Sequence, residues 1–168
     1  MNVSMRHPPL IRAPICLLRD IVPIIRRSQK EPFSAQQMYQ LVNDVDSYPS
    51  FLPWCRGSRI LKSTPTMMEA SILTAKGPLN KWFTTRNTLV ENEKITLNLI
   101  DGPFKHLRGE WRFIDLPEGG SEIHLMIDFD FSFGPARLLL TPIFENITGS
   151  MVSAFSAQAK VRYGKLLG

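Results

Sequence analysis

Cysteine and histidine are scarce in this sequence. Its 168 residues include two cysteines, Cys16 and Cys55, and three histidines. Their spacing fits neither a disulfide framework nor a zinc site, so no metal ligands are predicted and a reducing compartment is favoured. We therefore expect a cytoplasmic protein if the source is bacterial, or one on the matrix side of the mitochondrion if it is eukaryotic.

Long hydrophobic runs are missing as well. The apolar tract at residues 13–18 lies between Arg12 and Arg19 and is too short to cross a bilayer, so no transmembrane segment is expected and only peripheral membrane contact stays open. Residues 1–21 have two interpretations, a targeting leader or an extension upstream of a true start at Val22. We favour the second and expect one folded domain at residues 22–168.

Signatures of catalysis are also lacking. The sequence has no glycine-rich phosphate loop, nucleophile elbow or HExxH motif. Asp128 and Asp130 alternate with phenylalanines and are expected to face solvent. Arg86 and Asn87 are the only polar candidates for a pocket interior, and an outward-facing strand position is favoured for both. The sequence predicts a protein that is not an enzyme and requires no cofactor, with a cyclase-like enzyme as a distant alternative.

The most informative segment present is FSAQQMYQLVNDVDSYPSFLPWCR at residues 33–56. Ser34 and Gln37 form a capping-box pattern at the start of a helix, and Pro49 is expected to end that helix near Ser47. An elbow rich in aromatic residues and proline follows at residues 48–54. It has two interpretations, a buried corner of the core or the lid of an apolar pocket.

Turn signals divide the chain after this elbow into an antiparallel meander, preceded by a short strand at residues 23–30. The signals lie at Arg56-Gly57, Thr64-Pro65, Gly77-Pro78, Glu91-Asn92, Asp101-Gly102-Pro103 and Glu118-Gly119-Gly120. The longest alternation, residues 123–133, predicts that its odd-numbered side chains face the core. A helix from Pro135 to about Tyr163 follows, with a restart or kink at Thr141-Pro142, and it is long enough to cross the sheet.

Four segments carry a family resemblance. They are MYQLVNDVDSYPSFLPWC at residues 38–55, FTTRN at 83–87, DGPFKHLRGEWRF at 101–113 and SMVSAF at 150–155. Together they resemble the coenzyme Q-binding branch of the START-like, polyketide cyclase-like superfamily, and most of all its bacterial RatA-type ribosome association toxins. The resemblance implies an α+β helix-grip fold, in which a curved antiparallel sheet wraps around the long C-terminal helix.

The resemblance also implies a ligand, ubiquinone or a related isoprenoid-like lipid, bound in an apolar cavity in support of respiration. We expect the mouth of this cavity near Leu52, Trp54 and Phe104. The expected ligand-binding residues are Leu52, Trp54, Phe104, Leu107, Trp111, Phe129, Phe131, Phe144, Met151 and Phe155.

A second implied function is binding to the large ribosomal subunit, which would block subunit association, and the two functions can coexist. Such binding would use the outer surface of the protein. The candidate contacts are Arg56, Arg59, Lys62, Lys105, Arg108 and Arg112. A net charge of +5 permits a nucleic-acid partner without requiring one.

Overall fold

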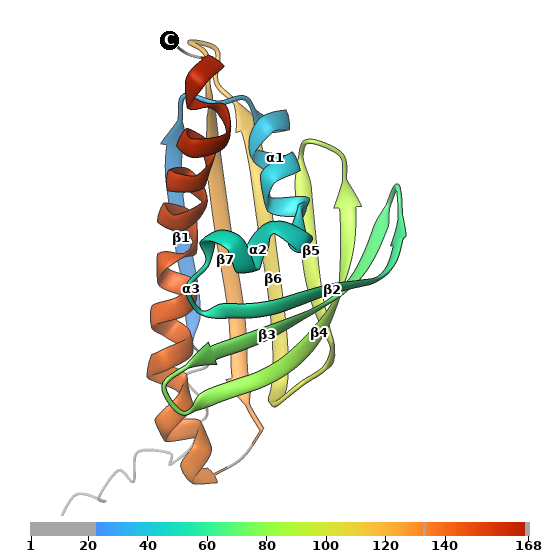
Figure 1. The fold of residues 1–168 in the computed structure, drawn as a ribbon, viewed down its shortest axis with the longest axis vertical. Helices are drawn as coiled ribbons and strands as arrows, with labels where there is room; N and C mark the ends of the chain where they lie inside the picture. Colours follow the sequence, from blue (N-terminus) through green and yellow to red (C-terminus); the bar gives the residue numbers. More distant parts are fainter. Residues whose placement is uncertain (1–22, 133, 167–168) are drawn as a thin grey trace, which may run out of the picture.

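A seven-stranded antiparallel sheet forms the framework of the protein, for which a computed structural model describes residues 23–132 and 134–166 (Figure 1). The strands are β1 (Ile24–Glu31), β2 (Cys55–Thr64), β3 (Met67–Lys76), β4 (Leu79–Val90), β5 (Lys94–Asp101), β6 (Phe104–Asp115) and β7 (Ser121–Phe131). Strands β2 to β7 follow one another as a meander, and β1 pairs with β7, so that β1 and β2 form the two edges of the sheet. The predicted meander is confirmed.

Five of the six predicted turns separate strands, but the one at Arg56-Gly57 is wrong. These residues belong to β2, where a bulge interrupts the register between Cys55 and Gly57. A Cβ atom on Gly57 would lie 3.0 Å from Cη2 of Trp82, which crosses over this position. Glycine at this position accommodates the close approach of an aromatic ring rather than a turn.

The alternation in β7 is confirmed through Phe131, because Ile123, Leu125, Ile127, Phe129 and Phe131 are all buried. Phe133, the last residue of the predicted pattern, lies outside the described residues, as does the extension predicted at residues 1–21.

The two aspartates of β7 behave differently. Asp128 is half-buried and lies 2.8 Å from the His106 ring on β6. The prediction that Asp130 faces solvent is wrong, since this residue is 4% exposed. Arg137 covers it from the following helix, with its Nε atom 2.8 Å from Asp130 Oδ1. The aspartate can be buried because a cation accompanies it.

The predicted capping box is present at the start of α1 (Ala35–Asn43), where Ser34 and Gln37 exchange hydrogen bonds. The helix ends earlier than predicted. A 3₁₀ turn (Val45–Ser47) follows it, and the predicted elbow at residues 48–54 begins with a short helix, α2 (Tyr48–Phe51). Pro49 lies in the first turn of α2, where a missing N–H costs nothing.

The long helix α3 (Gly134–Tyr163) runs beside β1 and β7 and covers the sheet (Figure 1). The α+β helix-grip class is therefore confirmed. The helix continues through Pro142, so it does not restart there, and the alternative of a kink stays a prediction. Pro142 has no backbone N–H to donate a hydrogen bond to the carbonyl of Leu138. Both residues are exposed, so water can donate to that carbonyl instead.

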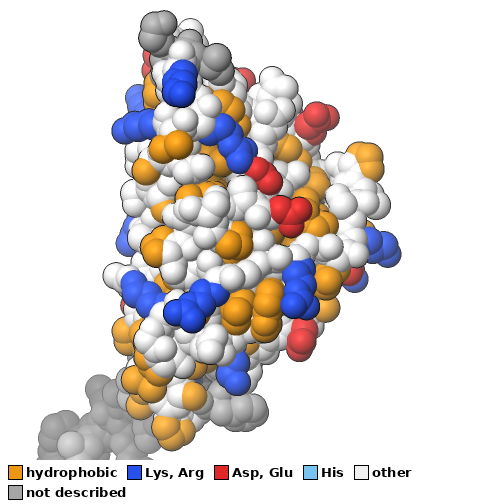
Figure 2. All heavy atoms as spheres, viewed as in Figure 1, with side chains coloured by type: hydrophobic (Ala, Val, Ile, Leu, Met, Phe, Trp, Pro, Cys, Tyr) orange, Lys and Arg blue, Asp and Glu red, His pale blue; other side chains and the backbone are white. Residues whose placement is uncertain are grey.

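Length and composition alone would let α3 span a membrane, and among the described residues it is the one helix for which this holds. In the structure its inner face is buried in the domain core, including Phe144, Ile147 and Phe155. Its first turns are different, because Leu138 and Leu139 are exposed. Hydrophobic side chains gather on the surface at the end of the molecule where α3 begins (Figure 1 and Figure 2).

Candidate functional site

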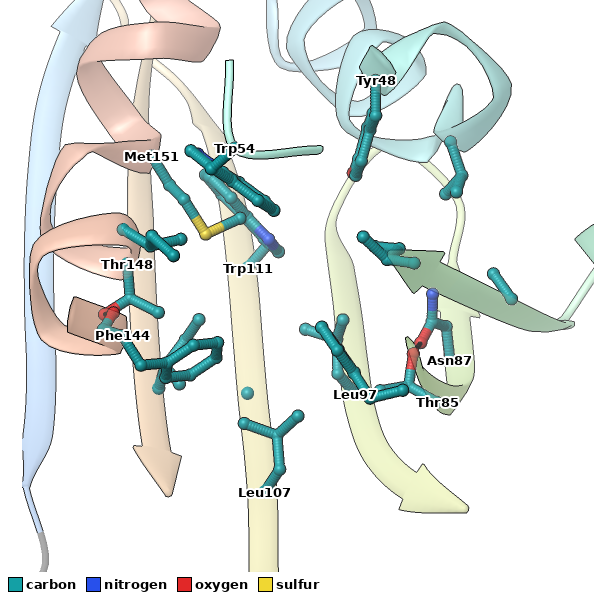
Figure 3. A pocket seen from close by; sticks show the side chains of 17 residues that line it. Tyr48, Trp54, Thr85, Asn87, Leu97, Leu107, Trp111, Phe144, Thr148 and Met151 are labelled. Atoms are coloured by element: carbon teal, nitrogen blue, oxygen red, sulfur yellow. Dashed lines mark hydrogen bonds between the residues drawn. The ribbon is translucent and has the colours of Figure 1, made fainter. Parts of the chain in front are cut away.

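A cavity of about 60 Å³ lies between α3 and the sheet (Figure 3). Its walls come from α3, from strands β3 to β7 and from the segment between α1 and β2. The lining residues are Val45, Tyr48, Trp54, Ala70, Ile72, Phe83, Thr85, Asn87, Leu97, Leu107, Gly109, Trp111, Ile127, Phe144, Ile147, Thr148 and Met151. This wall is predominantly apolar and therefore suits a hydrophobic guest.

The cavity is small for such a guest. Its volume of about 60 Å³ is that of roughly two water molecules, whereas sites for organic ligands hold about 300–1,000 Å³. Binding of a quinone or lipid therefore requires side chains to move. Met151, half-buried on α3, is an unbranched side chain that can change rotamer at little cost.

One wall of the cavity carries a polar pair. Thr85 and Asn87 are 3% and 5% exposed and point inward from β4 (Figure 3). The Thr85 hydroxyl donates a 2.8 Å hydrogen bond to Asn87 Oδ1. Among the described residues, the Asn87 side chain makes no other hydrogen bond, so its amide N–H groups remain available as donors at the cavity wall. The site can thus accept an apolar molecule that carries a carbonyl or ether oxygen.

Acid–base groups are rare in this wall. Tyr48 is its one titratable residue among those described. Burial raises the pKa of Tyr48 far above the ordinary value, and its hydroxyl donates a hydrogen bond to the carbonyl of Val42. The Tyr48 phenol therefore stays protonated at neutral pH, and its proton is already donated to the Val42 carbonyl. The cavity is equipped for binding and offers no general acid or base near neutrality.

Of the ten residues predicted to bind a ligand, the structure brings five to the cavity wall. These are Trp54, Leu107, Trp111, Phe144 and Met151. The other five, which lie in the surrounding core, are Leu52, Phe104, Phe129, Phe131 and Phe155. The three residues at the expected mouth, Leu52, Trp54 and Phe104, are all buried.

The aromatic core holds two groups of rings beside the cavity. Phe155 is fully buried, with its ring centroid 5.3 Å from those of Tyr48, Phe51 and Trp111. Phe104 stacks on Phe131 at 4.6 Å. Phe51, Phe104, Phe131 and Phe155 do not line the cavity and contribute packing energy behind its wall.

Sequence reasoning missed the polar pair. The outward position favoured for Arg86 is correct, since this residue is exposed and pairs with Glu69 at 2.7 Å. The same expectation for Asn87 is wrong, because Asn87 is buried. A signal was available in the sequence, as Thr85 and Asn87 share the parity of Leu89, which also faces inward.

The six basic residues predicted to contact a ribosome are all exposed, but they form two groups. Arg56, Arg59 and Lys62 lie on β2, at one edge of the sheet. Lys105, Arg108 and Arg112 lie on β6, between β5 and β7. Three strands, β3 to β5, separate the two groups in the sheet.

The helix-grip architecture with an apolar cavity beneath α3 defines a START-like domain. A family described as polyketide cyclase / dehydrase and lipid transport matches residues 32–156, and the chain belongs to this family.

Sequence identity to individual relatives shows how similar this chain is to particular members of the family. The ribosome association toxin RatA of Escherichia coli K12 is 46% identical over 147 residues, which are 88% of this chain and 93% of that protein. The mitochondrial coenzyme Q-binding protein COQ10 homolog B of Xenopus laevis is 28% identical over 137 residues, 79% of this chain and 56% of that protein. The resemblance identified from the four sequence segments is thereby confirmed.

Solved structures bear out the fold. The ZhuI aromatase/cyclase from Streptomyces sp. R1128 superposes with a TM-score of 0.75 at 18% identity, covering 84% of this chain and 95% of that one. At 18% sequence identity, this similarity shows a shared fold and does not indicate a shared function. The same fold thus hosts enzymes as well as proteins named for association or binding, and function must be argued from the site.

Proposed function

We propose that this protein associates with the ribosome in the bacterial cytoplasm, where it binds the large subunit and hinders subunit joining. The observation that carries the proposal is the 46% identity to the ribosome association toxin RatA, maintained over 93% of that protein. Identity that spans nearly all of a relative includes its surface, and a shared partner is the simplest physical reason for a shared surface. Exposed basic side chains on β2 supply charges suited to ribosomal RNA.

Sedimentation tests this proposal. Purified protein is mixed with separated ribosomal subunits, the magnesium concentration is raised to promote joining, and the products are resolved on a sucrose gradient. We expect the protein to migrate with the large subunit and the peak of joined ribosomes to shrink as protein is added. If the protein remains at the top of the gradient and joining is unaffected, the proposal is wrong.

The cavity supports a second function, the non-enzymatic binding of ubiquinone or a related hydrophobic molecule. The supporting observation is an apolar wall with a single polar pair, Thr85 and Asn87. The relative named as a coenzyme Q-binding protein agrees with this chemistry. Interior binding and outer-surface ribosome association use different residues, so one molecule can perform both.

Fluorescence tests the second function, because Trp54 and Trp111 line the cavity. A short-tailed ubiquinone should quench their emission with saturation. Ala70→Val places two methyl groups in the cavity and should weaken that binding. Ala136→Val, the same change at an exposed position of α3, is the matched control and should leave binding intact. Absence of saturable quenching in the unmodified protein, together with no lipid in solvent extracts, would exclude this function.

A further inference from the structure

Charge is distributed unevenly between the two halves of the sheet. Residues 47–90, which include β2 to β4, contain six Lys or Arg side chains and one carboxylate, Glu69. Residues 24–31 and 91–131, which include β1 and β5 to β7, together contain ten carboxylates and seven Lys or Arg side chains. The sheet therefore has one half with an excess of positive charge and one half with an excess of negative charge.

The positive half ends in an edge strand. Arg56, Arg59 and Lys62 are exposed on β2, and no described strand pairs with the outer side of β2. No Asp or Glu occurs between Asp46 and Glu69 in the sequence. Glu69 lies opposite Lys62 in the register and is already paired with Arg86. Cations on this edge thus outnumber the carboxylates that could neutralise them.

The basic residues of β6 lie in a different electrostatic environment. Arg112 forms an ion pair with Glu110 on its own strand. Arg108 stands directly opposite Asp128 in the register with β7. Both arginines have carboxylates as near neighbours, which lowers the positive potential around these two side chains. Arg26 and Arg27 of β1 line the same hollow as Arg112 and Glu110.

An exposed aromatic ring accompanies the basic edge. The Trp82 side chain on β4 is 39% exposed, and the Arg59 guanidinium lies 4.8 Å from its ring centroid. Gly57 provides the space for the ring to reach over β2. Single-stranded nucleic acid is commonly bound by aromatic rings on which bases stack, flanked by cations that hold the phosphates. The Arg59–Trp82 pair offers both elements at one place.

We propose that Arg56, Arg59, Lys62 and Trp82, here named the β2 edge, form the surface that contacts ribosomal RNA. The three cations bind backbone phosphates, and an unpaired base stacks on the Arg59–Trp82 pair. This inference rests on the ribosome association proposed above and specifies which face performs it. RNA is the occupant that the charge favours, since a strand without carboxylates complements a polyanion.

Two matched triple variants test the inference, Arg56→Gln/Arg59→Gln/Lys62→Gln on β2 and Lys105→Gln/Arg108→Gln/Arg112→Gln on β6. Each removes three positive charges, and circular dichroism with thermal unfolding confirms that each is folded. Binding to purified large subunits and to protein-free ribosomal RNA is measured at several salt concentrations. The β2 variant should bind both targets about tenfold more weakly or worse, and the slope of log affinity against log salt should become shallower by about 2. The β6 variant should lose less than about twofold on the same scale.

Trp82→Leu supplies a readout for stacking. It should weaken binding to RNA with unpaired bases while leaving the salt slope unchanged, because no charge is removed. Loss from both triple variants alike, or from the β6 variant alone, would overturn the assignment to the β2 edge. Subunit binding without any binding to protein-free RNA would point to a ribosomal protein and also overturn it. If the unmodified protein binds neither target, ribosome association itself fails.

Discussion

Ser156 on α3 donates a hydrogen bond of 3.0 Å to Oε2 of Glu31 on β1, and this bond joins the long helix to the edge of the sheet. Gln29 extends the connection by donating to the Ser156 hydroxyl at 2.7 Å. Glu31 is 4% exposed, and burial raises its pKa above the ordinary value of a glutamate, although Ser156 and Lys160 act in the opposite direction.

The raised pKa of Glu31 predicts a pH dependence of stability. Between the unfolded and folded pKa values the folded state binds more protons, so the free energy of unfolding decreases as pH rises through that window. Glu31→Gln cannot ionise and should remove this decrease, giving a flatter profile in urea unfolding between acidic and neutral pH. Glu118→Gln, in an exposed turn, should leave the profile as it is. An unchanged profile in the Glu31 variant would show that this carboxyl does not cause the dependence.

Phe155 and Met151 should differ in their contributions to stability, although both were predicted to bind ligand. Phe155 is fully buried among three aromatic rings, whereas Met151 is half-buried and borders an existing void. Phe155→Ala should lower the free energy of unfolding by about 3–5 kcal/mol. Met151→Ala should cost clearly less and should mainly alter ligand binding. Equal losses in chemical denaturation would contradict this division between core and cavity wall.

Thr85 and Asn87 should be energetically coupled. Asn87→Leu leaves the buried Thr85 hydroxyl without its acceptor, which costs about 1–3 kcal/mol. Thr85→Val/Asn87→Leu removes both polar groups and should be less destabilising than the two single changes added together. A double-mutant cycle by urea unfolding should give a coupling of about 0.5–3 kcal/mol. Strict additivity would indicate that the hydrogen bond contributes nothing.

Gly120 and Gly119 provide a matched pair in the turn between β6 and β7. Both have positive φ, +74° and +101°, so alanine introduces backbone strain at either position. A Cβ atom on Gly120 would lie 2.1 Å from the carbonyl oxygen of Glu31, whereas one on Gly119 would have no atom within 4 Å. Gly120→Ala should therefore be the more destabilising by about 1 kcal/mol or more. The opposite order in thermal unfolding would contradict this turn geometry.

Strong local patterns made much of the fold predictable from sequence. Alternation in β7 and the capping box of Ser34 both survive in the structure because each fixes a local geometry and also buries the correct face. The failures arise where a distant partner decides the outcome. Asp130 is buried because α3 brings Arg137 to it, and Gly57 lies in a strand because β2 pairs with β3 there, opposite Leu73.

The candidate site was less predictable than the fold. Large aromatic residues are predicted to bind the ligand, but two of them, Phe129 and Phe155, belong to the core. Smaller residues such as Ala70 and Gly109 line the cavity instead. A cavity forms where side chains are short, so the positions of large residues in the sequence do not predict where it lies. The six basic residues form two groups for a similar reason, since separation between strands is set by sheet order rather than by sequence.

The uneven charge of the sheet has a kinetic consequence. A sheet with an excess of positive charge on β2 to β4 and an excess of carboxylates on β1 and β5 to β7 carries an electric dipole. Near a polyanion a molecule with such a dipole experiences a torque that turns its positive end forward before any contact forms. Encounters are then pre-oriented, so added salt should slow the association rate constant more than it changes the dissociation rate constant.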